Sequence, residues 1–232
     1  MHVLALDAAT EACSVALLRG EESICRFSEG GLPHAQQILG MVEAVLAEAQ
    51  VSLSMLDGIA ASIGPGAFTG VRISVAVAQG LAFGADLRVV PVTTLEALAL
   101  RAVRSGAGHA LACLDARMGE VYWACFAADP VRGLIATAAA RVGPPEDVVL
   151  PVPGAYRGIG RGFAVHPVIG ALPGLELSLE DRGELPNASE FARLGALRFG
   201  LGEGLDAADL RPLYLRDKVA LTEAERRASR PH

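Results

Sequence analysis

The stretch SIGPGAFTGVRISVAVAQGLAFG, from Ser62 to Gly84, decides the fold of this chain. A short apolar segment leads into a loop with Gly64, Gly66 and Gly70, and a helical pattern follows. A strand, a glycine turn and a helix N-terminus leave backbone N–H groups free to hold an anion, with the positive end of the helix dipole behind them. The stretch is therefore typical of a phosphate site in an α/β protein.

The loop departs from the two common nucleotide-binding motifs. Gly70 is followed by Val71 and Arg72, so the Lys-Ser/Thr pair of a Walker A loop is missing, and the glycine spacing is not GxGxxG. The residues alone therefore leave open whether the loop holds a nucleotide or only keeps the shape of a loop that did.

The residues around this stretch predict strands first, and then alternating helices and strands. Residues 2–28 contain three apolar segments separated by polar turns, which is typical of an antiparallel meander. The elements predicted after it are a helix at 33–49, a strand at 58–64, a helix at 69–83, a strand at 87–92, and a helix to about residue 104 that Thr93 and Glu96 cap. This order predicts a mixed sheet covered by helices.

The pattern starts again after GAGH, so we place a lobe boundary between residues 1–105 and 106–232. Leu114-Asp115-Ala116 matches Leu6-Asp7-Ala8, and each triplet ends one strand and turns into the next. Two related lobes, the second reduced, resemble the actin-like ATPase-domain fold (ASKHA, RNase H-like), which is an α/β fold. In the second lobe we further expect a short helix at PPEDVVL, a strand at YRGIG, a loop at 161–186, and a returning C-terminal helix capped by Asn187 with Glu190.

Composition excludes several classes of protein. The chain has 232 residues, 52% of them apolar, which is enough for one large domain or two small lobes. No apolar run approaches the roughly 18 residues of a membrane span, and the N-terminus has no signal-peptide pattern. Four cysteines without a CxxC pair predict reduced thiols in a cytoplasmic protein. The net charge of −6 predicts no basic surface for nucleic acid.

Asp7 and Asp115 are the acidic candidates of the two lobes. In a catalytic protein of this fold, an aspartate after the first strand holds Mg²⁺ or a metal-bound water while glycine turns from both lobes wrap the phosphates. Alternatively, each carboxylate accepts hydrogen bonds from backbone N–H groups of its own turn. We favour the second interpretation, because the nearest second glycine turn, GIGRGF at 158–163, carries the bulky Arg161.

The helix predicted at 69–83 lacks a polar face, because Arg72 and Gln79 are the main interruptions among its apolar residues. A surface helix normally keeps a polar side, so this one needs cover on both sides. One side can lie on the sheet, and the other can face the helix at 33–49 or another subunit. If a subunit covers it, the predicted partner surface consists of Ile38, Leu39, Val42, Leu46, Arg72, Val75 and Gln79.

Four segments in order, LALDAATEACSVAL, IGPGAFTGVRISVAVAQGLA, LDARMGEVYWA and RPLYLRDKVA, resemble the TsaB (YeaZ) family over essentially the whole chain. The resemblance implies an actin-like fold and a role in threonylcarbamoylation of the adenosine beside the anticodon in ANN-decoding tRNAs. That family is similar to the catalytic subunit TsaD and acts as its non-catalytic dimer partner. The implied partners are a TsaD-like subunit, a TsaE-like ATPase, a second copy when alone, and tRNA through the complex, with no membrane.

The departures from TsaD-like proteins concern the metal site. Those proteins carry HHMEGH, whose histidines bind the metal, where this chain has TTLEAL at 93–98. Thr94 and Leu98 therefore stand at the ligand positions, where a leucine cannot coordinate and a hydroxyl is a poor replacement for imidazole. The comparison implies no catalytic residue, no cofactor and no metal. It makes the phosphate-loop candidates Asp7, Gly64, Gly66 and Gly70 vestigial.

Three hypotheses about function follow. The favoured one is a non-catalytic scaffold, the alternative is a small-molecule kinase or ATPase of the actin-like fold, and the third is a peptidase, for which no nucleophile constellation is visible in the sequence. The strand GEVYWACF adds a structural expectation. Tyr122 and Trp123 must point to opposite faces, so one belongs to the core and the other to the surface or the lobe junction.

Overall fold

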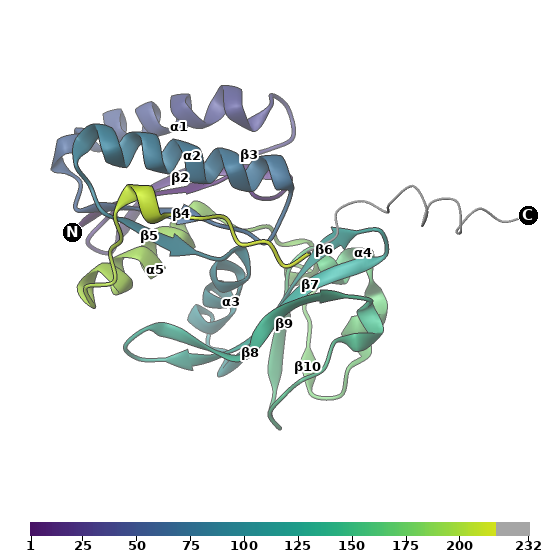
Figure 1. Cartoon of the computed structure of the whole chain (residues 1–232). Coiled ribbons are helices and arrows are strands. Elements are labelled where there is room, and N and C mark those ends of the chain that lie inside the picture. The colour runs from purple at the N-terminus through teal and green to yellow at the C-terminus, as the bar shows by residue number, and fades with distance from the viewer. Residues whose placement is uncertain (217–232) are drawn as a thin grey trace, which may run out of the picture.

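The computed structural model describes residues 1–216 and has two five-stranded sheets with helices outside and between them (Figure 1). The last four residues of the segment RPLYLRDKVA lie outside the described residues. The α/β class and the actin-like arrangement expected from the sequence are confirmed by the sheet topology below.

The first sheet comes from the N-terminal part of the chain. Its first three strands form the predicted antiparallel meander, and its last two run parallel to the first. The strand order is β3-β2-β1-β4-β5. Strand β4 is buried along its whole length, because helices cover both faces of the sheet. The strands are β1 (His2–Asp7), β2 (Ala12–Arg19), β3 (Glu22–Glu29), β4 (Gly58–Ser62) and β5 (Val89–Val92).

The second sheet repeats this topology. Its order is β10-β9-β6-β7-β8, again with an antiparallel meander and two further strands parallel to the first. The repetition suggested by the two Leu-Asp-Ala triplets is therefore a repetition of fold. The strands are β6 (His109–Arg117), β7 (Glu120–Asp129), β8 (Gly133–Gly143), β9 (Tyr156–Ile159) and β10 (Leu175–Glu176).

The helices form one layer outside the first sheet and one layer between the sheets. Helices α1 (His34–Ala49) and α2 (Phe68–Ala85) cover the outer face of the first sheet (Figure 1). Helix α5 (Ala188–Gly200) packs on the inner face of that sheet, and α3 (Thr94–Arg104) packs on the second sheet. Because α3 and α5 also contact each other, they join the two lobes.

Of the two predicted capping boxes, the one at α3 forms and the one at α5 does not. At α3 the capping box is confirmed: Glu96 N–H donates to Thr93 Oγ1 at 3.1 Å, and Thr93 N–H donates to Glu96 Oε2 at 2.8 Å. At α5 the Asn187 side chain accepts from Ser189 N–H at 2.9 Å, and no box forms with Glu190. Glu190 lies instead beside arginines of α3 and α5.

The segment predicted as a loop, 161–186, contains short elements. It holds the four-residue helix α4 (Gly162–Val165), strand β10 and two 3₁₀ turns. Asp181 organises the last part, because it accepts from Arg157 Nε at 2.9 Å and from the Ser178 hydroxyl at 2.6 Å. The expected helix at PPEDVVL is a single 3₁₀ turn, Pro145–Asp147.

The end of the described chain returns to the first lobe. Helix α5 lies on β1, β2 and β4, and Leu205 pairs with Val89 at the edge of the sheet. Leu213 N–H then donates to the Ile63 carbonyl at 2.7 Å. A boundary at residue 105 separates the two sheets, but the residues from α5 onward pack on the first sheet.

The two aromatic residues of β7 lie on opposite faces, as predicted. Trp123 is 5% exposed and packs with Val121, Phe163 and other apolar residues on the outer side of the second sheet. Tyr122 is half-buried, packs against the core between the lobes, and lines the cleft described below. Trp123 is therefore the core residue, and Tyr122 is at the lobe junction.

We expect Trp123→Ala to lower the free energy of unfolding by about 3–5 kcal/mol, because it leaves a large cavity in a closed cluster. Tyr122→Ala should cost less, about 1–2 kcal/mol, since its ring is already partly in water. Urea denaturation followed by far-UV circular dichroism measures both. Equal losses at the two positions would contradict this assignment of the faces.

Candidate functional site

A small cavity of about 160 Å³ lies in the cleft between the lobes. It is lined by the turn after β1 (9–11), the glycine loop (66–67), the end of β6 (114–117), Tyr122 and Arg161. In an actin-like protein this is the place where a phosphate would meet the glycine turns. The structure therefore allows each vestigial candidate to be examined in turn.

The glycine loop is pressed against the chain's own β1–β2 turn. A Cβ atom on Gly66 would lie 2.1 Å from the Ala9 carbonyl oxygen, and one on Gly70 would lie 1.9 Å from that of Ala8. Ala67 N–H donates to the Ala9 carbonyl at 2.7 Å. Gly64 has φ +97°, a conformation that favours glycine. These contacts explain all three glycines without a ligand, because the space that a side chain would need is filled by backbone.

Asp7 is fully buried and does not line the cavity. Its Oδ1 accepts from Ala9 N–H at 3.0 Å, which is the turn bond expected under the structural interpretation. Burial raises the pKa of this carboxyl to about 6, against the opposing effects of that hydrogen bond, of Ser62 and of His34. Oδ2 and the Ser62 hydroxyl are both buried, and neither has a partner at full hydrogen-bonding geometry.

Asp115 repeats the turn bond of Asp7 in the second lobe. Its Oδ1 accepts from Arg117 N–H at 3.0 Å, and Oδ2 lies 3.1 Å from Arg117 Nη1. Unlike Asp7, it borders the cavity, with 9% of its side chain exposed. His166 Nε2 lies 3.7 Å from the same carboxylate, beyond hydrogen-bonding distance. The cavity therefore has two carboxylates, Asp115 and Glu11, and Arg117 holds both, with its Nη2 2.6 Å from Glu11 Oε1.

The second glycine turn also serves packing. A Cβ on Gly160 would lie 2.2 Å from the Cys113 carbonyl oxygen, and one on Gly162 would lie 2.5 Å from Cys113 Sγ. Between them, Arg161 borders the cavity and forms an ion pair with Glu29 at 2.7 Å. Gly66 and Gly70 thus contact the turn after β1, whereas Gly160 and Gly162 contact Cys113 inside β6.

The positions of the metal ligands in TsaD-like proteins are inside packed structure here. The Thr94 hydroxyl donates to the Pro65 carbonyl, and both groups are buried. Leu98 is 1% exposed and belongs to the core between the lobes. Within residues 1–216, no group of three or more His, Cys, Asp or Glu side chains is arranged to hold a metal ion.

The cysteines offer no activated nucleophile. Burial raises the pKa of Cys13 to about 12 and of Cys125 to about 11, and it also raises the pKa values of Cys25 and Cys113. A thiol becomes reactive when its pKa falls, so these thiols are protonated at neutral pH. All four are free, in agreement with the expectation of reduced thiols.

Three of the seven residues predicted for the partner surface are buried, and the other four are exposed or half-buried. Ile38, Val42 and Val75 are at most 5% exposed and belong to the core between α1, α2 and the first sheet. These three therefore cannot line a surface. Ile38 and Val42 are on the buried stripe of α1, and for Val75 the sequence of a helix that is apolar all round does not show which side faces the sheet. Leu39 and Arg72 are exposed, whereas Leu46 and Gln79 are half-buried.

The outer face of α2 is apolar and largely open. Phe83 is 87% exposed and Phe68 is 47% exposed, and a Cβ on Gly80 would meet nothing within 4 Å. Helix α2 is also long and apolar enough, by length and composition, to cross a membrane, which the count of apolar runs did not reveal; it packs on β4 with a third of its residues buried. The open face, which we call the α2 stripe, consists of Phe68, Arg72, Ile73, Ala76, Val77, Gly80 and Phe83.

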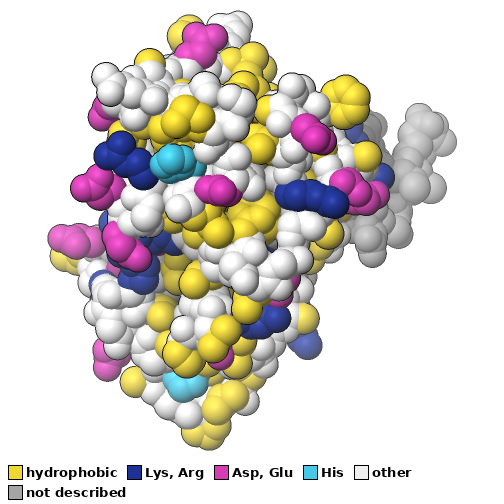
Figure 2. Space-filling view, turned by 90° about the vertical axis from the view of Figure 1, so that its left-hand side faces the viewer, with side chains coloured by type: hydrophobic (Ala, Val, Ile, Leu, Met, Phe, Trp, Pro, Cys, Tyr) yellow, Lys and Arg dark blue, Asp and Glu magenta, His cyan; other side chains and the backbone are white. Residues whose placement is uncertain are grey.

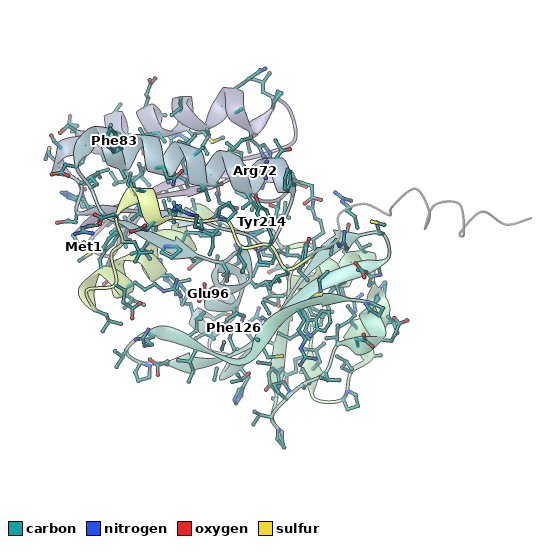
Figure 3. All side chains as sticks on the ribbon, viewed as in Figure 1. Met1, Arg72, Phe83, Glu96, Phe126 and Tyr214 are labelled. Atoms are coloured by element: carbon teal, nitrogen blue, oxygen red, sulfur yellow. The ribbon has the colours of Figure 1, made fainter. Side chains whose placement is uncertain are left out.

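Two of the polar residues of α2, Arg72 and Gln79, hold the returning chain. Gln79 Nε2 donates to the carbonyls of Ala207 and Leu210, at 3.0 and 3.2 Å. Arg72 Nε donates to the Tyr214 hydroxyl at 2.9 Å, and its guanidinium lies 3.7 Å from the centre of the Phe68 ring. Figure 3 shows Arg72 and Tyr214 together at one end of α2 and Phe83 at the other. Helical periodicity could have indicated Phe83 and Phe68, but only the fold shows Tyr214 beside Phe68, with the ring centroids 5.6 Å apart.

Comparisons with known proteins agree with this architecture. The family model described as TsaD, tRNA N6-adenosine threonylcarbamoyltransferase, matches residues 30–143. The chain is 38% identical to the tRNA threonylcarbamoyladenosine biosynthesis protein TsaB of Escherichia coli K12, over 95% of this chain and 96% of that protein. The Haemophilus influenzae protein of the same name is 36% identical, over 94% and 95%.

Two solved structures from Pseudomonas aeruginosa are also similar. The one described as YeaZ has a TM-score of 0.84 at 40% identity, covering 92% of this chain and 99% of that chain. The other, described as an uncharacterized protein with similarity to peptidase YEAZ, has a TM-score of 0.85 at 40% identity, covering 93% and 99%. The likeness therefore extends over both lobes.

The buried Asp7 carboxyl predicts a specific pH dependence of stability. The folded state binds its proton more tightly than the unfolded state, so this group's contribution to stability falls as pH rises from about 4 to about 6. Asp7→Asn keeps the acceptor for Ala9 N–H and carries no charge. Its free energy of unfolding should therefore gain on that of the parent by about 2 kcal/mol between pH 4 and pH 7.

Urea denaturation at four pH values across this range measures the gain. Glu22→Gln, a neutralised carboxylate at an exposed position, provides the baseline. A difference between parent and Asp7→Asn that stays constant with pH would show that Asp7 is not the titrating group.

Proposed function

Because the chain belongs to the TsaB family, we propose that it acts in the biosynthesis of threonylcarbamoyladenosine in tRNA as a subunit without catalytic activity of its own. The modified base is the adenosine beside the anticodon of ANN-decoding tRNAs. The catalytic step belongs to a TsaD-like partner, which this chain supports by forming a dimer with it.

The packing of the cleft supports the absence of catalysis. Gly66 and Gly70 approach the backbone of the β1–β2 turn where a phosphate cradle would be open. Leu98 occupies a position that holds a metal ligand in TsaD-like proteins, and it is part of the core. Metal-assisted transfer needs a coordinated ion with an open position, and these side chains supply no ligand for one.

The α2 stripe is the observation that carries the proposed dimer. An exposed apolar helix face of this length on a protein surface marks an interaction site. The small residues Ala76 and Gly80 allow a second helix to approach closely. The match to the TsaD model, residues 30–143, includes α1 and α2, so a TsaD-like protein presents a comparable pair of helices. A surface that pairs with its own copy in an isologous dimer can therefore pair with such a relative.

The remaining partners follow from this assembly. The net charge of −6 favours tRNA contact through the complex over direct binding by this subunit. A TsaE-like ATPase supplies nucleotide turnover, and the complex works in the cytoplasm. Leu39 and Leu46 of α1, with Arg72 and Gln79 of α2, form the border of the interface.

The purified chain should neither hydrolyse ATP nor contain stoichiometric metal. Phosphate release and elemental analysis of the isolated protein measure these two properties. ATP turnover that Asp7→Asn or Asp115→Asn abolishes would favour the alternative, a small-molecule kinase or ATPase. Bound zinc or iron would overturn the account of Thr94 and Leu98.

A charge on the α2 stripe should break both dimers. Ala76→Glu and Phe83→Glu each place a carboxylate in the proposed contact without disturbing the core, because both positions are exposed. A buried, unpaired charge should weaken self-association and binding to the TsaD-like subunit by about a hundredfold or more. Sedimentation, binding of the purified partner and threonylcarbamoyladenosine formation in a reconstituted system measure the three effects.

Leu179→Glu is the matched control, because Leu179 is 84% exposed in the second lobe and far along the chain from α2. Charges at Val42 or Val75 do not test the interface, since they would unfold the lobe. The proposal fails if Ala76→Glu and Phe83→Glu bind the partner as tightly as Leu179→Glu does.

A further inference from the structure

A hollow with an apolar floor lies between the two lobes at the opposite end of β1 from the cleft. Its volume is about 500 Å³, within the range of small-molecule sites. The start of β1 at Met1 and the end of β2 form one wall, α3 and α5 form the floor, and Gly133 at the start of β8 closes the far side. We call it the back groove. Figure 2 looks onto this side and shows apolar side chains across the middle of the molecule, with charged side chains beside them.

The floor of the back groove is apolar. Leu18 and Leu100 are each 3% exposed, and Leu197 at the rim is 36% exposed. These side chains sit on the core that joins the lobes. The turn before β8 fits closely here, because a Cβ on Gly133 would lie 2.9 Å from Leu197 Cδ1 and 3.2 Å from Leu100 Cδ1. The groove therefore has a rigid floor that can hold an apolar group.

The rim of the back groove carries two loosely paired arginines. Arg104 Nη1 lies 3.9 Å from Glu190 Oε2, and Arg193 Nη1 lies 3.9 Å from Glu21 Oε2. Every other arginine–carboxylate pair among residues 1–216 has a contact of 3.2 Å or less. Arg104 and Arg193 both face this groove, and neither has a carboxylate closer than 3.9 Å, although Arg193 Nη2 also donates to the Glu21 carbonyl at 3.4 Å. Their remaining N–H donors are available to a bound anion.

The two carboxylates near these arginines do not neutralise the positive charge of the arginines. Glu21 is fully exposed, so water screens its charge. Glu190 lies behind the arginines, and burial raises its pKa even though Arg104 and Arg193 oppose the shift. One of its oxygens is buried without a hydrogen bond. The groove is therefore complementary to an anion with an apolar body, since the arginines stand above an apolar floor.

We propose that the back groove binds a small amphipathic carboxylate, with its apolar chain on Leu18 and Leu100 and its carboxylate between Arg104 and Arg193. Such a ligand contacts the N-terminal sheet, α3, α5 and the turn before β8 at once. It would therefore stabilise the arrangement of the two lobes. The site is separate from the cleft and from the α2 stripe, so it stands independently of the proposed dimer.

Sodium octanoate is the probe, added to the isotope-labelled full chain and followed by two-dimensional amide NMR. Octanoate should shift the signals of Gly20, Gly133 and Leu197 in a saturable manner. Acetate, which lacks the chain, and 1-octanol, which lacks the charge, should each bind at least tenfold more weakly. Arg104→Gln combined with Arg193→Gln should weaken octanoate at least tenfold, and Ala196→Trp should abolish binding by filling the groove.

Arg88→Gln is the control, because Arg88 is an exposed arginine that pairs with Asp206 away from the groove. It should leave octanoate affinity unchanged. Thermal unfolding of each variant confirms that it is folded, and the double arginine variant carries the test if Ala196→Trp is not. Shifts confined to the α2 stripe, equal binding of octanol, or no loss in the double variant would each overturn the proposal.

Discussion

The close approach between the glycine loop and the β1–β2 turn is the constraint on which the rest of the structure depends. The Ala8 and Ala9 carbonyls occupy the space next to Gly66 and Gly70 that any side chain would need. This contact fixes where α2 begins and how it lies on β4. It also accounts for both glycines without a ligand, so one packing contact explains the composition of the loop and sets the direction of the helix whose outer face stays open.

The sequence could predict elements whose signals are local. The capping box of Thr93 and Glu96 and the meander of the first 28 residues depend on neighbouring residues, and both are confirmed. The side of α2 that faces the sheet could not be predicted in the same way. A helix that is apolar all round has little periodic signal, so Val75 was placed on the partner surface when it belongs to the core. Tyr214 lies beside Arg72 only because the chain returns from α5, which is a tertiary effect that no local pattern contains.

The two lobes share a topology but differ in what they can present. Each has an aspartate that accepts from the N–H two residues later, and each has a glycine turn packed against its first strand or the turn that follows it. The first lobe continues from this turn into the 18-residue helix α2, whereas the second continues into the four-residue helix α4. Reduction of the second lobe thus removes the counterpart of the α2 stripe. The proposed partner surface occurs once in each polypeptide. This favours a closed dimer over an open-ended assembly of subunits.

The return of α5 to the first sheet has a consequence for how the protein is made. Phe191, Ala192 and Leu194 belong to the same core as Val3, Ala5 and Ala60, so one face of the first sheet stays uncovered until nearly the whole chain has left the ribosome. The first lobe cannot complete its folding as an independent N-terminal unit, as domains commonly do during synthesis. Its apolar inner face is exposed while residues 93–187, between the end of β5 and the start of α5, are translated. The nascent protein is therefore most vulnerable to aggregation late in its synthesis, and the last helix ends that exposure.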